Sequence, residues 1–214
     1  MRGKTINIIA GGMAALLLMA GAAGAGEIKR TNYVAAKGYY ARAYGDTLPP
    51  IGFVGFCARY EEECQPRQVR TARMRLTPAR WDLIMQVNTY VNRKVKPVTD
   101  QELYNQPEVW DYPSGAGDCE DYVLLKMRYL EELGVPPETM MITVVLDEAG
   151  EGHAVLMLRT DSGDFILDNR RDRVMPWYKT GYRYLKRQSQ EDPSRWVSLT
   201  RDKGKGARFL SGNR

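Results

Sequence analysis

The spacing of apolar side chains predicts two amphipathic helices in the middle of the chain. Over 78–95, apolar residues recur every three or four positions, after a Thr-Pro pair that suits the start of a helix. A second helix is expected from Asp118 to Leu133, because Gly134 and Pro136 stop it. Its apolar stripe is broad, which is typical of a helix packed in the centre of a domain.

After the second helix, the period of the apolar residues changes from that of a helix to that of strands. Short β-branched or apolar runs separated by turns predict an antiparallel meander. The expected strands are 140–146, 153–159, 165–168, 182–186 and 196–199. Prolines and glycines indicate irregular structure over 26–76 and a loop over 96–117. Helices followed by an antiparallel sheet indicate the α+β class, with the helices packed on the sheet.

The first 25 residues have the three parts of a secretory signal peptide. Arg2 and Lys4 form a basic region, and an apolar stretch over 6–20 follows. The tripeptide 23–25, Ala-Gly-Ala, has the small-x-small form that signal peptidase reads. The apolar stretch is shorter than the ~20 residues that a membrane-spanning helix needs. We therefore expect export and cleavage after Ala25; an uncleaved N-terminal anchor, the alternative, would also leave the domain outside the cytoplasm.

Removal of 1–25 leaves a chain long enough for one domain with a sizeable core. We expect the irregular segment 26–76 to pack with the main domain, 77–214. The net charge of the whole chain is +5 and falls to +3 without the signal peptide. This mild excess, without regularly interleaved aromatic residues, does not indicate nucleic-acid binding. No later segment is apolar enough to span a membrane.

The chain has three cysteines, an odd number for an exported protein. Cys57 and Cys64 lie seven residues apart in a polar, turn-prone segment, and we expect them to form a disulfide in an oxidising compartment. The alternative, a metal site, is weaker because no second pair of Cys or His ligands exists. Cys119 is then the free thiol.

Cys119 lies in the first turn of the second predicted helix, after glycines at 115 and 117. The partial positive charge of a helix N-terminus favours a thiolate, and its free N–H groups can bind an oxyanion. Cys119 is therefore a candidate nucleophile. The alternative is a buried free cysteine that only fills space, which is the commoner role of such a residue.

Three carboxylates flank the candidate nucleophile: Asp118, Glu120 and Asp121. If nothing neutralises them, their charge raises the pKa of the thiol. A hard cation such as Ca²⁺ would remove this conflict, because oxygen-rich sites suit it. The alternative, which spacing alone favours, is an acidic first turn that caps the helix without a metal.

His153 is the only histidine in the chain, and thus the only imidazole base available to a free thiol. Asp168 ends the next predicted strand and is the candidate to orient the imidazole. A tight hairpin that pairs Arg159 with Phe165 would place Asp168 opposite Leu156, on the wrong face of the sheet. The proposed pair therefore requires an odd shift in register or a bulge. Otherwise Asp168 belongs to a turn.

These motifs resemble a known family, the bacterial transglutaminase-like cysteine proteinases (BTLCP). The resemblance covers roughly residues 50–178. The matching segments are Gly-Ala-Gly-Asp-Cys-Glu-Asp-Tyr at 115–122, Gly-His-Ala-Val-Leu at 152–156, Leu-Asp-Asn at 167–169, the helix segment 86–92, and the cysteine segment 56–64.

The resemblance implies a papain-like fold of the transglutaminase type, with Cys119, His153 and Asp168 as the triad of a cysteine protease. Relatives in this family are periplasmic, calcium-dependent proteases that cleave the N-terminal region of a large surface adhesin and so release biofilm contacts. A protein substrate, an inner-membrane regulatory receptor and a periplasmic location are therefore expected.

By the same resemblance, Asp118, Glu120 and Asp121 are the expected calcium ligands. Two other functions use the same motifs. A non-catalytic transglutaminase-like module would bind a peptide or an envelope partner, and a transglutaminase would transfer the acyl group to an amine.

Overall fold

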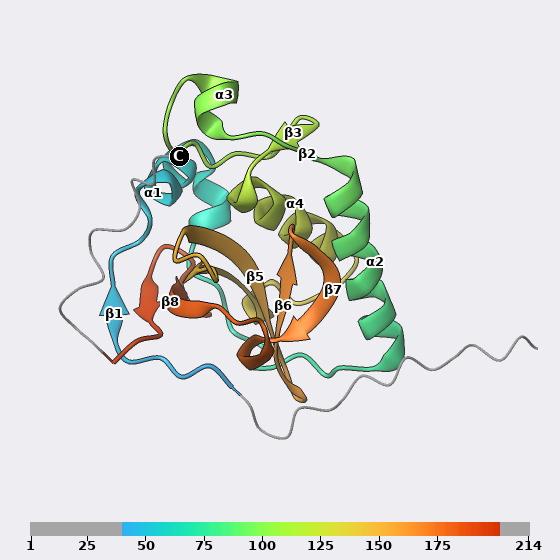
Figure 1. Cartoon of the computed structure of the whole chain (residues 1–214). Coiled ribbons are helices and arrows are strands. Elements are labelled where there is room, and N and C mark those ends of the chain that lie inside the picture. Colours follow the sequence, from blue (N-terminus) through green and yellow to red (C-terminus); the bar gives the residue numbers. More distant parts are fainter. Residues whose placement is uncertain (1–39, 202–214) are drawn as a thin grey trace, which may run out of the picture. The chain divides into compact units, whose positions relative to one another are not determined.

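Two helices of the computed structural model, α2 (Pro78–Lys94) and α4 (Cys119–Glu132), lie together beside an antiparallel sheet (Figure 1). α4 packs against the central strand β5, and α2 packs against both α4 and the edge strand β7. The side chain of Thr77 accepts a hydrogen bond from the N–H of Arg80 and caps α2, as its Thr-Pro start predicts. The predicted α+β class is confirmed.

The structure describes residues 40–201. The predicted signal peptide, its cleavage site after Ala25 and residues 26–39 lie outside the described residues. Within 40–201, no helix is long and apolar enough to cross a membrane.

The sheet of the described domain has seven strands in the order β1-β9-β8-β4-β5-β6-β7, and all neighbouring strands are antiparallel. Their bounds are β1 (Asp46–Thr47), β4 (Met140–Leu146), β5 (Gly152–Thr160), β6 (Gly163–Asp168), β7 (Arg171–Pro176), β8 (Arg183–Gln188) and β9 (Trp196–Ser198). Two further short strands, β2 (Lys96–Pro97) and β3 (Ala116–Gly117), pair in parallel just before α4.

Both faces of the three central strands are buried, so their sequences read as continuous apolar runs. One face packs with the helices and includes Val144, Leu156 and Leu167. The opposite face belongs to a second apolar cluster with Val155 and Ile166. This second cluster also contains the tyrosines at 182 and 184, which lie close to the proposed site.

The prediction of irregular structure over 26–76 is wrong for part of that segment. Residues Ile51–Arg59 form helix α1, and a 3₁₀ turn over Glu61–Cys64 follows. The disulfide Cys57–Cys64, with an S–S distance of 2.03 Å, joins these two elements. Glycine is required at 52, because a Cβ there would collide with the indole ring of Trp110. Together with Pro49, Pro50 and Gly55, this glycine led to the prediction of irregular structure.

The loop predicted over 96–117 also contains more structure than expected. Besides β2 and β3, it forms the one-turn helix α3 (Asp100–Tyr104). Thr99 and Glu102 form a capping box at its start: the Thr99 side chain accepts from the N–H of Glu102, whose carboxylate accepts from the N–H of Thr99. α3 carries Asp100 to the start of α4.

Candidate active site

Cys119 is the first residue of α4, and its sulfur contacts the beginning of strand β5. The sulfur accepts a hydrogen bond from the N–H of Ala154 at 3.3 Å. It also donates one to Oε2 of Glu120 at 3.0 Å. Because Ala154 follows His153 directly in β5, the free thiol and the only histidine of the chain converge at the same end of the sheet.

Burial raises the pKa of the Cys119 thiol well above its ordinary value, and the charges of Glu120 and Asp118 raise it further. The hydrogen bond from Ala154 acts in the opposite direction. The helix N-terminus alone is therefore not enough to make the sulfur a thiolate while both carboxylates are ionised.

His153 and Asp168 form a buried pair, in which Nε2 of the imidazole lies 2.9 Å from Oδ1 of the carboxylate. Nδ1 of His153 is buried and has no hydrogen-bond partner among residues 40–201. A proton on Nε2, donated to Asp168, leaves Nδ1 as the free base. This is the tautomer that a catalytic histidine needs.

The carboxylate of Asp168 is held as an anion by its donors. Burial alone would raise its pKa, but the hydrogen bond and charge of His153, together with hydrogen bonds from Tyr182 and the N–H of Arg170, lower the pKa to about 2. The hydroxyl of Tyr182 lies 2.6 Å from Oδ2. An ionised carboxylate in this place stabilises the imidazolium form of the histidine.

The register of β5 and β6 explains how the pair can form. Arg159 lies opposite Asp164, and Leu156 lies opposite Leu167. This register is shifted by one residue from the hairpin that would misplace Asp168. Since side chains alternate between the faces of a strand, the shift puts Asp168 on the same face as His153. The odd shift that the sequence required is present.

An acidic cluster lies next to Cys119, where Asp100, Asp118 and Glu120 bring carboxylate oxygens within 4.8 Å of one another. One oxygen of Asp100 and one of Asp118 are buried without a hydrogen-bond partner among the described residues. Burial raises the pKa of Asp100 to about 6, and burial with the charge of Asp118 raises the pKa of Glu120 well above its usual range. Such an oxygen-only set can hold a hard cation.

This cluster differs from the set expected from the sequence, because Asp121 is not a member of it. Oδ1 of Asp121 accepts from the N–H of Asp111 at 2.9 Å, and Oδ2 accepts from the N–H of Asp118 at 3.4 Å. Asp121 therefore ties the preceding loop to the helix. Asp100 takes its place in the cluster, and sequence reasoning missed it because it lies on another helix, far upstream.

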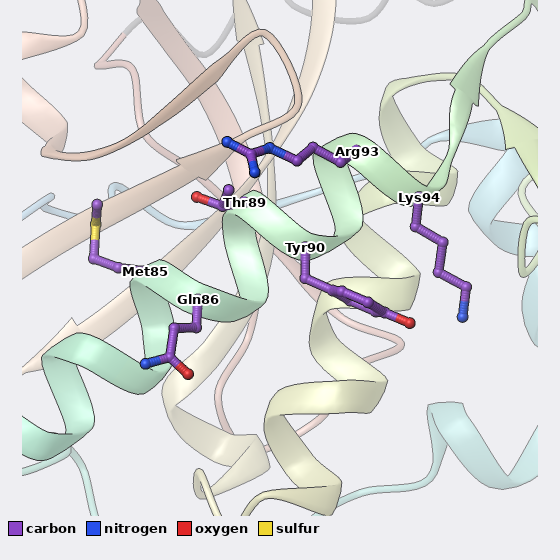
Figure 2. A pocket seen from close by; sticks show the side chains of 6 residues that line it. All are labelled: Met85, Gln86, Thr89, Tyr90, Arg93 and Lys94. Carbon is purple, nitrogen blue, oxygen red and sulfur yellow. The ribbon is translucent and has the colours of Figure 1, made fainter.

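A shallow pocket on the outer surface of α2 contains none of these residues. Figure 2 shows its lining side chains, all of which come from α2. They are Met85, Gln86, Thr89, Tyr90, Arg93 and Lys94. Asn92, one turn after Thr89 on the same helix, does not line this pocket; its Nδ2 donates to the backbone oxygen of Asp168 at 3.0 Å. The pocket and the candidate catalytic residues are therefore separate.

A cysteine at the start of a buried helix, beside a histidine and an aspartate on an antiparallel sheet, defines the transglutaminase-like class. A family model described as "bacterial transglutaminase-like cysteine proteinase BTLCP" matches residues 43–204. The chain therefore belongs to this family of cysteine peptidases. The resemblance found from the sequence motifs is confirmed.

Solved structures of LapG from Legionella pneumophila are similar to the chain. The calcium-bound form is 23% identical, with a TM-score of 0.49, over 64% of this chain and 77% of LapG. A second structure of LapG is 23% identical, with a TM-score of 0.47, over 55% of this chain and 68% of LapG. An EGTA-treated form has the same identity and TM-score and covers 66% of LapG. A search of curated proteins gives no match.

Proposed function

We propose that the chain is an exported protease that hydrolyses peptide bonds with the triad Cys119, His153 and Asp168. The observation that carries the proposal is the orientation of the imidazole. Its Nε2 is bound to Asp168, and its free Nδ1 lies at the end of β5 that the sulfur contacts through Ala154. These are the relations that a cysteine nucleophile, its base and the orienting group need.

In the proposed mechanism, Nδ1 of His153 takes the proton of Cys119, and the thiolate attacks the carbonyl carbon of a peptide bond. The N–H of Cys119, at the start of α4, supplies part of the oxyanion site. The imidazolium then protonates the leaving amine, and an acyl-enzyme remains. His153 next takes a proton from a water molecule, whose oxygen attacks the carbonyl carbon of the thioester. The C–S bond breaks, the carboxylate product leaves, and the imidazolium returns its proton to the sulfur, which restores the thiol. Asp168 stabilises the imidazolium in both halves of the reaction.

We propose that calcium binds to Asp100, Asp118 and Glu120. Support comes from the three converging carboxylates and from the buried oxygens of Asp100 and Asp118 that have no partner among the described residues. A divalent cation there would offset the negative charge that raises the pKa of Cys119. The family resemblance also favours calcium over other hard cations.

The substrate of a cysteine peptidase is a protein, and we propose a cell-envelope or surface protein, such as a large adhesin. An inner-membrane receptor is the proposed regulator. Both proposals, and the periplasmic location, rest on the family resemblance and on the signal-peptide pattern over 1–25. The arrangement of the chain into 1–25, 26–76 and 77–214 remains a prediction.

The test is incubation of the purified mature protein with bacterial envelope proteins, with calcium present, followed by mass spectrometry of new N-termini. Wild-type protein should produce new N-termini, and Cys119→Ala should produce none at a nearly unchanged melting temperature. Thr89→Ala, on the outer side of α2, is the control and should cleave normally. A biotinylated amine in the same reaction separates acyl transfer from hydrolysis. Cleavage by Cys119→Ala at the wild-type rate would contradict the proposal.

A further inference from the structure

The tyrosine at position 182 contacts both proposed partners of the nucleophile, although the mechanism above gives it no role. It lies between β7 and β8, on the face of the sheet that carries His153 and Asp168. We propose that Tyr182 is a positioning residue, whose hydroxyl fixes the Asp168 carboxylate in the orientation that holds the imidazole. This inference rests on the proposed triad.

The contacts of Tyr182 restrict the carboxylate and the imidazole together. Its hydroxyl donates to Oδ2 of Asp168 at 2.6 Å, while Oδ1 faces Nε2 of His153 at 2.9 Å. Its ring stands nearly perpendicular to the imidazole, at 81°, with the ring centres 5.7 Å apart. With both oxygens engaged, the carboxylate cannot rotate without losing one hydrogen bond.

Tyr182 is itself held in place by its neighbours. Its N–H donates to Oγ1 of Thr180 at 3.2 Å, and the preceding Gly181 takes the left-handed conformation, with φ of 83°, that lets the chain turn there. The guanidinium of Arg171 lies 5.1 Å from the centre of the tyrosine ring. Arg171 also donates to the backbone oxygen of Thr180 at 3.0 Å and forms an ion pair with Glu148.

This Arg171–Glu148 pair connects the tyrosine to the two turns that adjoin the strands of His153 and Asp168. Glu148 lies in the turn before β5, whereas Arg171 follows the turn after β6. The neighbouring pair, Arg170 with Asp147 at 2.5 Å, joins the same two turns. Tyr182 therefore lies in a network that spans the strands of His153 and Asp168, rather than in an isolated apolar contact.

The direction of the hydrogen bond between Tyr182 and Asp168 is fixed at neutral pH. Burial and the hydrogen bond to Asp168 raise the pKa of Tyr182, so the phenol keeps its proton and donates. Asp168, with a pKa of about 2, keeps its charge and accepts. The pair is thus a charge-assisted hydrogen bond between a neutral donor and an anion, a stronger kind of bond than one between neutral groups.

A purely structural tyrosine would have the same burial but a different response to loss of the hydroxyl. The chain offers a matched control in Tyr184, which lies two residues further on, in the same apolar cluster. The hydroxyl of Tyr184 lies 3.1 Å from Oγ1 of Thr180. Tyr182→Phe and Tyr184→Phe each keep a buried ring and remove one hydroxyl, but only the first removes a donor to Asp168.

The test uses ¹⁵N NMR of the imidazole, which is unambiguous because the chain has one histidine. Wild-type protein and Tyr184→Phe should show His153 with its proton on Nε2. Tyr182→Phe should show a mixture of tautomers, and alkylation of Cys119 by iodoacetamide should slow about tenfold. The melting temperatures, measured alongside, should fall for both Phe variants, and further for Tyr182→Phe, because its lost hydrogen bond is charge-assisted.

Two outcomes separate the inference from the function on which it rests. If Tyr182→Phe keeps both the Nε2 tautomer and the wild-type alkylation rate while Asp168→Asn loses them, the positioning role is wrong and the triad stands. If Asp168→Asn also leaves the tautomer and the rate unchanged, the proposed triad itself is wrong.

Discussion

The sulfur of Cys119 lies 3.0 Å from Oε2 of Glu120, so the proposed nucleophile and a proposed calcium ligand are in direct contact. Any change in the charge of that carboxylate acts on the thiol through a single hydrogen bond in a buried place. The acidic cluster and the proposed nucleophile are therefore electrostatically one unit, so calcium binding would change the reactivity of the thiol without any movement of the chain.

Calcium should raise the reactivity of Cys119. Binding to the cluster offsets the negative charge next to the sulfur, so the pKa of the thiol falls and a larger fraction is thiolate at neutral pH. Iodoacetamide alkylation should be several times faster with calcium than with EGTA, and the melting temperature should rise with calcium concentration. Identical rates and melting temperatures under both conditions would exclude a calcium site beside Cys119.

Glu120→Gln should mimic part of the effect of calcium. The amide keeps the shape of the side chain but cannot carry the negative charge next to the sulfur, so in EGTA, at a pH at which Glu120 is ionised, alkylation of Cys119 should be faster than in wild type. The acceleration by calcium should shrink, because a ligand has been lost. Glu132→Gln, at the exposed end of α4, is the control and should alkylate like wild type. A slower reaction in Glu120→Gln contradicts the argument.

Gly117→Ala should destabilise the protein. A Cβ at position 117 would collide with the carboxylate of Asp121, which ties the preceding loop to α4. We expect a loss of about 1–3 kcal/mol in the free energy of unfolding, as for other overpacked sites, and a loss of activity through the displaced helix start. Gly55→Ala, within α1, where a Cβ would only make an ordinary van der Waals contact with the Arg59 side chain at 3.6 Å, should be neutral or slightly stabilising. Urea unfolding of both variants compares the two outcomes.

Lys126→Met should stabilise the protein, and more so at low pH. The ammonium of Lys126 is fully buried without a hydrogen-bond partner among residues 40–201. Burial lowers its pKa to about 7, although the charges of Asp168 and Asp172 act in the other direction. At pH values between about 7 and the ordinary pKa of a lysine, the side chain at position 126 is protonated in the unfolded chain but largely neutral in the folded one. The lysine therefore costs most stability below about pH 7, and the cost falls as the pH rises.

The expected gain from Lys126→Met is about 1–4 kcal/mol below neutral pH, with a smaller gain at alkaline pH. Urea unfolding at several pH values measures it. Lys179→Met, at an exposed position, should show no pH-dependent gain. A gain for Lys126→Met that is the same at every pH would mean that the buried ammonium is not the cause.

The elements that could be predicted from the sequence are those with strong local signals. Thr77 and Pro78 mark the start of α2, and Gly134 with Pro136 marks the end of α4, so both helices lie within one or two residues of their predicted bounds. The central strands have continuous apolar runs. Even the register that brings Asp168 to His153 could be stated as a requirement, because a shift of one residue moves a side chain to the other face.

The parts that could not be predicted depend on contacts between distant segments. Helix α1 is stabilised because its Phe53 packs against Trp110 and Trp196. The residue spacing within α1 does not indicate these two distant contacts. Strand β7 is polar at three of its six positions, so it lacks an apolar run. Asp100 comes from helix α3 and Tyr182 from the segment between β7 and β8, and only the folded structure shows that they lie next to Asp118 and Asp168.

The disulfide Cys57–Cys64 has a consequence for the free cysteine of the same chain. Conditions that oxidise Cys57 and Cys64 to a disulfide can also oxidise the free thiol of Cys119. Oxidation is far faster for a thiolate than for a thiol. Burial and the acidic side chains beside it raise the pKa of Cys119 and so protect the thiol from oxidation, and a cation that offsets the acidic side chains would weaken this protection. A nucleophile kept as its thiol until calcium arrives would survive in the compartment that forms the disulfide, and become reactive only where calcium is present.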